Sequence, residues 1–113
     1  MNTKKKKTVK KVMAENNTDA VKANKDCMRN LVPEMYKQGE DNLYFFIAAL
    51  SSEENLSDID ACEASAICLR NVKELLDELN IMEQDKRKKL QELIDKSVDI
   101  CTDRKKSLKN VNK

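Results

Sequence analysis

Histidine and tryptophan are absent from the 113-residue sequence, and glycine and proline occur once each. Without histidine, the chain lacks the side chain that most often acts as a general base near neutral pH. With one Gly and one Pro, it has few residues that favour tight turns, whereas Leu, Ala, Lys and Glu favour helices. The composition therefore predicts an all-α fold, which we expect to be a three- or four-helix antiparallel bundle.

Catalytic and metal-binding motifs are also missing from the sequence. There is no glycine-rich phosphate loop, no nucleophile elbow and no Glu-x-x-His pair. The spacing of the four cysteines matches no zinc pattern, and we expect them to fill buried helix faces: Cys27, Cys62, Cys68 and Cys101. We therefore expect a protein that is not an enzyme and that uses no cofactor, metal or small-molecule substrate.

Aromatic residues make up only 4% of the chain, and the longest apolar run, residues 43–50, has eight residues. A membrane-spanning helix needs about 20 apolar residues, so no membrane contact is expected. The basic N-terminus is followed by a polar stretch and not by the apolar segment of a signal peptide. This predicts a cytoplasmic location, either free in the cell or inside a particle. The thin apolar core predicts self-association or an obligate partner protein.

Charge is distributed unevenly along the chain, although the formal net charge is only +2. Residues 1–11 carry six lysines and no acidic residue, and residues 104–113 carry five cations and no acidic residue. The intervening residues 12–103 have a net charge of −9. We therefore predict a basic, flexible tail over residues 1–17 and a mainly acidic helical bundle, with a basic end, over residues 18–113.

The basic ends admit three interpretations. Cations set against phosphates release counterions, so the ends can bind RNA or DNA without sequence specificity. They can instead contact the acidic body of another copy or of a partner protein. They can also act only as a solubilising tail and as cations that favour a helix C-terminus. The candidate phosphate contacts are Lys4, Lys5, Lys6, Lys7, Lys10, Lys11, Arg104, Lys105, Lys106 and Lys109.

Helical periodicity extends across the apolar run. Pro33 either kinks a first helix or separates it from the next one. A helix over residues 33–51 would place Phe46 at the centre of the core. Tyr44 and Phe45 flank its inner face, and they are either buried in the monomer, which is the favoured case, or part of a protein interface.

Two longer helices are predicted after the apolar run. Ser57-x-x-Asp60 resembles a capping box and predicts a helix over residues 58–80. A short connection, in which Asn80 takes the left-handed conformation, leads into a last helix over residues 83–109. Because the connection is so short, these two helices should form an antiparallel hairpin.

Acidic residues gather at the start of the helix over residues 58–80. They offer a docking face for a basic partner protein, formed by Asp58, Asp60 and Glu63. In principle they could also meet Glu92 and Asp95 across the hairpin. Carboxylates on charged helices more often form a solvated face, so such a meeting does not predict catalysis.

The last two predicted helices carry the sequence LLDELNIMEQDKRKKLQELIDKSVDICTDRKKSL. Its turn, Leu79-Asn80-Ile81-Met82, its segment QELIDK and its basic C-terminal end resemble the last two helices of a four-helix-bundle family. This family includes the accessory variability protein of diversity-generating retroelements and proteins encoded in intervening sequences of ribosomal RNA genes. The resemblance implies a small oligomeric bundle that associates with nucleic acid or with a reverse transcriptase.

The sequence therefore favours a non-enzymatic helical bundle that forms oligomers and serves as an accessory or structural subunit of a nucleic-acid-containing assembly. In this hypothesis the lysine-rich ends contact the phosphate backbone. The alternatives are a protein-only adaptor or inhibitor and a structural component of a virion or other particle. Both alternatives would use the acidic face and the basic ends for protein contacts.

Overall fold

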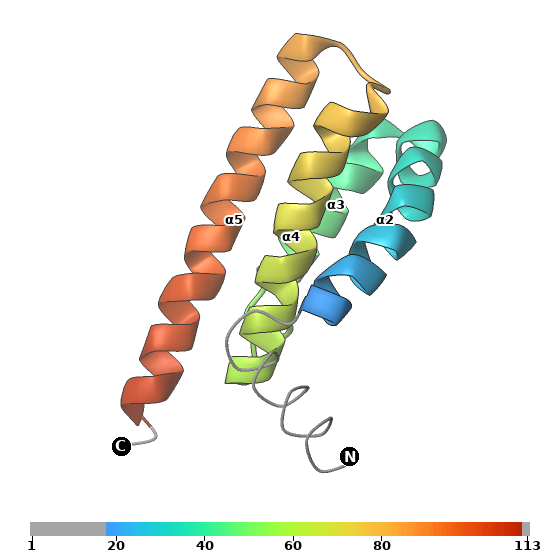
Figure 1. Ribbon diagram of the computed structural model, residues 1–113. Helices are drawn as coiled ribbons and strands as arrows, with labels where there is room; N and C mark the ends of the chain where they lie inside the picture. Colours follow the sequence, from blue (N-terminus) through green and yellow to red (C-terminus); the bar gives the residue numbers. More distant parts are fainter. Residues whose placement is uncertain (1–17, 112–113) are drawn as a thin grey trace, which may run out of the picture.

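The computed structural model describes the backbone of residues 18–111. Helices α2 (Thr18–Gln38), α3 (Glu40–Leu50), α4 (Ile59–Leu79) and α5 (Gln84–Val111) follow one another along this range (Figure 1). No strand occurs in this described part of the chain. The predicted all-α bundle is confirmed, with four helices, whereas the predicted tail over residues 1–17 lies outside the described residues.

Helices α4 and α5 form an antiparallel hairpin (Figure 1). Two ion pairs across it define the direction: Lys73 Nζ lies 2.6 Å from Asp95 Oδ1, and Lys105 Nζ lies 3.6 Å from Glu63 Oε1. From the first ion pair to the second, the residue number rises in α5 and falls in α4. The predicted hairpin is therefore confirmed, and the start of α4 lies beside the end of α5.

Helix α2 runs parallel to α4. Lys25 Nζ lies 3.2 Å from Glu74 Oε1, and Arg29 Nη1 lies 3.4 Å from Glu78 Oε1. The residue numbers of both partners increase together, which fixes the common direction. Helix α2 begins beside the middle of α4 (Figure 1), and α3 returns antiparallel to α2 and packs on both hairpin partners.

Helix α2 continues through Pro33, which resolves the two possibilities at that residue. The expected helix over residues 33–51 is wrong, because the chain is interrupted at Gly39 instead. Gly39 has φ 159° and ψ 136°, and its N–H donates to two carbonyl oxygens in the last turn of α2, each at 3.1 Å. Val32 is fully buried, so packing next to Pro33 offsets the helical hydrogen bond that proline cannot donate.

The core lies between the α4–α5 hairpin and the antiparallel pair α2–α3, which we call the first hairpin. Its largest fully buried side chains are Val32, Leu43, Ile47, Leu56, Leu69, Val72, Leu75, Leu76 and Ile94. In α3, Leu43 and Ile47 are fully buried, whereas Phe46 is only half-buried against the core. The prediction of Phe46 at the centre is wrong, because the residues four apart that α3 turns inward are Leu43 and Ile47.

The ends of α4 agree with the prediction to within one residue, although the cap is different. The N-cap is Asp58, whose Oδ1 accepts a hydrogen bond from the Ala61 N–H at 2.7 Å, and not Ser57. Asp is as good an N-cap as Ser, and it lies one residue nearer to the helix. At the other end, Asn80 has φ 49° and ψ 47°, which confirms the left-handed cap.

The cysteines follow the expectation in three cases out of four. Cys62, Cys68 and Cys101 are buried and free, and burial raises the pKa of each of these thiols. Cys27 is exposed, which contradicts the prediction. Its neighbour Met28 takes the buried position of that turn.

The buried polar residue Asn71 connects α4 to α2. Asn71 of α4 is 2% exposed, and its Nδ2 donates to the Val21 carbonyl oxygen and to Asn24 Oδ1, each at 2.9 Å. Among the described residues, every buried side-chain nitrogen and oxygen has a hydrogen-bond partner. The position of α2 along α4 is therefore fixed by directional bonds as well as by apolar contact.

Candidate nucleic-acid interface

Four of the predicted phosphate contacts lie near the end of α5: Arg104, Lys105, Lys106 and Lys109. Two of them also contact the body of the bundle. Arg104 Nε donates to the Leu56 carbonyl oxygen at 3.2 Å, and Lys105 pairs with Glu63. These contacts hold the last turns of α5 against the start of α4.

Lys106 and Lys109 are exposed, and within the described residues neither takes part in an ion pair. Leu108 lies between them in the sequence, is half-buried and packs against the core. The last turn of α5 is therefore anchored on one side by an apolar contact while its cations face solvent on the other. Exposed lysine side chains of this kind can contact phosphate oxygens.

The other predicted cations, in residues 1–11, lie outside the described residues. Their chain nevertheless enters the bundle at a defined place, Thr18. Since α2 is parallel to α4 and α4 is antiparallel to α5, the start of α2 and the end of α5 are directed toward the same end of the bundle. The N-terminal end of α2 and the C-terminal end of α5 therefore point in one common direction.

The predicted acidic face lies at this same end, but its three members have different surroundings. Asp58 caps α4, and Glu63 is half-buried and paired with Lys105. Asp60 is exposed and forms no ion pair with a described residue. Only Asp60 therefore keeps a carboxylate fully available for a partner.

The acidic side chains at the start of α4 do not lie beside Glu92 and Asp95 of α5. Asp95 pairs with Lys73, whereas Glu63 pairs with Lys105, which lies ten residues further along α5. Ten residues of helix correspond to about 15 Å. The antiparallel register therefore keeps the two groups of carboxylates apart.

The predicted interface aromatics lie on α3. Tyr44 is half-buried against the core, whereas Phe45 is 71% exposed. The favoured expectation, burial within the monomer, is wrong for Phe45, because α3 turns that side outward. Ala48 and Ala49 are exposed on the following turn, so the outward face of α3 is largely apolar.

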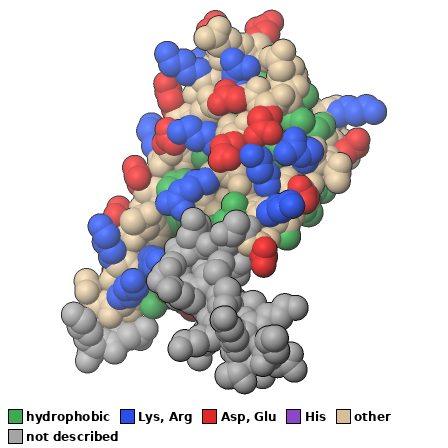
Figure 2. All heavy atoms as spheres, in the orientation of Figure 1, with side chains coloured by type: hydrophobic (Ala, Val, Ile, Leu, Met, Phe, Trp, Pro, Cys, Tyr) green, Lys and Arg blue, Asp and Glu red, His purple; other side chains and the backbone are tan. Residues whose placement is uncertain are grey.

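Ion pairs of α2 neutralise much of the acidic surface on the second half of α4. Lys25 Nζ also lies 2.7 Å from Glu78 Oε2. The hydrogen bonds that Lys25 donates to Glu78 and Glu74 raise the pKa of Lys25, and the one to Glu78 lowers the pKa of Glu78. Figure 2 shows the result, with cationic and acidic side chains interspersed over the face that α2, α4 and α5 share.

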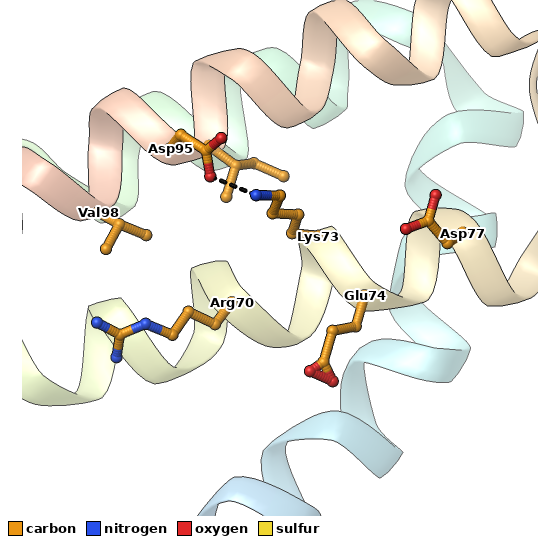
Figure 3. Close-up of a pocket in the computed structure, with 7 residues that line it drawn as sticks. Arg70, Lys73, Glu74, Asp77, Asp95 and Val98 are labelled. Atoms are coloured by element: carbon orange, nitrogen blue, oxygen red, sulfur yellow. Dashed lines mark hydrogen bonds and ion pairs between the residues drawn. The ribbon is translucent and has the colours of Figure 1, made fainter.

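A groove of about 420 Å³ runs between α4 and α5 (Figure 3). Its lining residues are Arg70, Lys73, Glu74, Asp77, Ile94, Asp95 and Val98. Arg70 lies at one end and Asp77 at the other, with the Lys73–Asp95 pair between them. Such mixed charge gives the groove no clear preference for an anion or a cation. The sequence reasoning singled out neither Arg70 nor Lys73, although the short Asn80 connection fixes the register that pairs Lys73 with α5.

In the part of the chain that the structure describes, no helix combines the length and the apolarity needed to cross a membrane. In the same residues, no group of three or more His, Cys, Asp or Glu side chains is arranged to hold a metal ion. Comparison of the chain with family models, curated proteins and solved structures gives no match.

Proposed function

We propose that this chain is a non-enzymatic accessory or structural subunit of a nucleic-acid-containing assembly. It contacts RNA or DNA phosphates through its two basic segments, without reading the base sequence. The resemblance to the retroelement accessory and intervening-sequence family implies a role of the same kind. The observation that carries the proposal is the common direction of the start of α2 and the end of α5.

With this geometry, the phosphate contacts of the two basic segments contribute to the same binding free energy. A phosphate backbone presents one negative charge every few ångströms, so cations that leave the bundle in one direction can contact one strand or duplex together. Lys106 and Lys109 are the foremost contacts from α5, because they are exposed on an anchored helix. Arg104 and Lys105 contribute more to the position of α5, since they also contact Leu56 and Glu63.

The test is binding of the full chain and of a 12–113 truncation to mixed-sequence RNA and duplex DNA over a salt series. The full chain should bind with an affinity that falls steeply with salt, and the truncation should bind much more weakly. Each lost phosphate contact reduces the slope of log K against log salt by about 0.9 on duplex DNA. Absence of binding by the full chain at low salt would refute the proposal.

A second candidate function is protein docking through the outward face of α3. The observation in its favour is Phe45, which is 71% exposed next to Ala48 and Ala49. Aromatic side chains of this kind are enriched in protein interfaces. Light scattering of the native chain and of Phe45→Ser would test it, with the exposed Glu92→Ser as control. Dissociation of an oligomer by Phe45→Ser alone would support the candidate, and equal masses for all three proteins would count against self-association there.

A further inference from the structure

Helices α3 and α5 pack against each other and run in the same direction (Figure 1). At the start of α3, Lys86 Nζ lies 3.4 Å from Glu40 Oε2. At the end of α3, the Ser51 hydroxyl group donates to Ser97 Oγ at 3.3 Å. Both contacts have a sequence separation of 46. Each residue of α3 therefore lies level with the α5 residue that comes 46 positions later in the sequence.

A partly apolar surface lies beside this contact, on the side turned to solvent. On α5, Gln91 and Asp95 contact α4, so the α3 side of the helix continues through residues spaced three and four apart: Lys89, Leu93 and Lys96. On α3, the residues at helical spacing between Glu40 and Ser51, together with their exposed neighbours, are Asp41, Tyr44, Phe45 and Ala48. We call these residues of the two helices the α3–α5 face. Phe45 is 71% exposed, so the described residues leave the apolar part of this face open.

The charged side chains of the α3–α5 face are divided between the two helices. Asp41 lies on α3, whereas Lys89 and Lys96 lie on α5, and all three are exposed. Within the described residues, none of the three takes part in an ion pair. Asp41 lies level with residue 87, so Lys96 is nine residues, or about 14 Å, further along the pair of helices. Phe45, which lies level with residue 91, is therefore close to the midpoint between the two charges.

The α3–α5 face is complementary to a second copy of itself. A two-fold axis normal to the face, at the level midway between Asp41 and Lys96, places α3 of one copy over α5 of the other and reverses the helix direction. It sets Asp41 of each copy opposite Lys96 of the other. Two further pairs lie equally far from this axis along the helices: Tyr44 with Leu93, and Ala48 with the aliphatic stem of Lys89. One symmetry operation therefore matches opposite charges and apolar side chains together.

We propose that two copies of the chain associate through the α3–α5 face as an antiparallel two-fold dimer. Asp41 of each copy pairs with Lys96 of the other, and the two Phe45 side chains meet near the axis. The occupant is a second copy because a single axis satisfies the charges at both edges of the face, with an aromatic residue at its centre, as is common in protein interfaces. This inference rests on the second candidate function, docking through α3, and it identifies the partner. It does not depend on nucleic-acid binding.

Sedimentation equilibrium of the full chain, without nucleic acid, tests the dimer. The native chain should show a monomer–dimer equilibrium. Asp41→Lys and Lys96→Glu each set like charges against each other at both symmetry-related contacts, and each should raise the dimer Kd by about tenfold or more. A native chain that stays monomeric at its highest soluble concentration would overturn the inference, whereas the nucleic-acid proposal is decided separately by RNA and DNA binding.

Compensating charges test the pairing itself. Asp41→Lys/Lys96→Glu restores opposite charges and should return the dimer Kd to near the native value. The matched control, Asp26→Lys/Lys96→Glu, has the same net charge but changes an exposed acid on α2, and its dimer should remain weak. Because Asp41 lies in the first turn of α3, thermal melting checks that each variant folds. Equal recovery in the two double variants would refute the specific contact, because only overall charge would then matter.

Mixing the two single variants separates pairing between copies from an effect within one copy. A heterodimer of Asp41→Lys and Lys96→Glu chains has opposite charges at both contacts, so the mixture should dimerise more strongly than either variant alone. Absence of this gain would overturn the pairing. If Phe45→Ser dissociates the dimer while the charge reversals leave it intact, docking through α3 stands and the antiparallel arrangement is wrong.

Discussion

Helix α4 has two long interfaces, one with α5 and one with α2, and they differ in the side chains that form them. On the α5 side, the buried residues are mainly apolar: Leu90, Ile94 and Cys101, with Ser97 among them. On the α2 side, only Met28 and Val32 are buried and apolar, and the contact is completed by Asn71 and by the ion pairs of Lys25 and Arg29.

The difference assigns separate roles to the two interfaces. Apolar contact is strong but not directional, so we expect the α4–α5 contact to contribute more to stability than the α2–α4 contact. The α2–α4 contact depends on hydrogen bonds that require one register, since a displaced Asn71 would leave a buried amide without partners. The first helix is therefore positioned accurately but held less strongly than the last.

The largest expected effect comes from the apolar interface. Ile94→Ala removes a fully buried side chain and should lower the free energy of unfolding by about 2–5 kcal/mol. Ile100→Ala is the matched control, because Ile100 is 48% exposed on the same helix, and its cost should stay within about 0.5 kcal/mol. Urea unfolding measures both, and similar losses would contradict the assignment of the core.

A mutation at the α2–α4 interface should cause a smaller and more local loss of stability. Asn71→Ala removes both hydrogen bonds to α2 and should cost about 1–3 kcal/mol. Hydrogen exchange should show the loss of protection mainly in α2, with α5 nearly unchanged. Asn30→Ala, at an exposed position of α2, is the control. A uniform loss over all helices would show that α2 is not a separable element.

A smaller effect is expected for the ion pair at the α4–α5 interface. Lys73 and Asp95 are both partly exposed, so a double-mutant cycle with alanine should give a coupling of about 0.2–1 kcal/mol. High salt should reduce this coupling. A coupling of several kcal/mol would show that the pair, and not apolar burial, holds the hairpin.

The smallest expected effect is the pH dependence of the α2 ion pairs. The lowered pKa of Glu78 means that its contribution to stability is complete above the ordinary glutamate pKa of about 4.3. It is lost as the pH falls through the lowered value. The stability difference between the native chain and Glu78→Gln should therefore shrink between neutral and acidic pH. A difference that grows on acidification would contradict the sign of this linkage.

The α4–α5 hairpin could be predicted almost completely from the sequence. Leu69, Val72 and Leu76 recur at helical spacing, and Asn80 is a residue that tolerates the left-handed cap. These signals are local, and the apolar interface does not override them. The same reasoning predicted the general position of the cationic helix end, including Lys106 and Lys109.

The first hairpin was predicted less well, because its structure depends on distant contacts. Pro33 is the stronger helix breaker by propensity, yet burial of Val32 keeps the helix intact and the break falls at Gly39. Asn71 carries no sequence signal for burial, since an Asn on a helix is usually exposed. Its partners Val21 and Asn24 lie 47 to 50 residues away.

The central claim is that both basic segments contact one nucleic acid from one end of the bundle. Its most direct test is the salt dependence of duplex DNA binding for the full chain, for Lys106→Gln/Lys109→Gln and for Lys88→Gln/Lys89→Gln. All four lysines are exposed on α5, and the second pair lies near its opposite end. The account predicts that the first variant reduces the slope of log K against log salt by up to about 1.8, whereas the second leaves it unchanged. Equal reductions for the two variants would contradict the account, because binding would then follow total charge and not the end of the bundle.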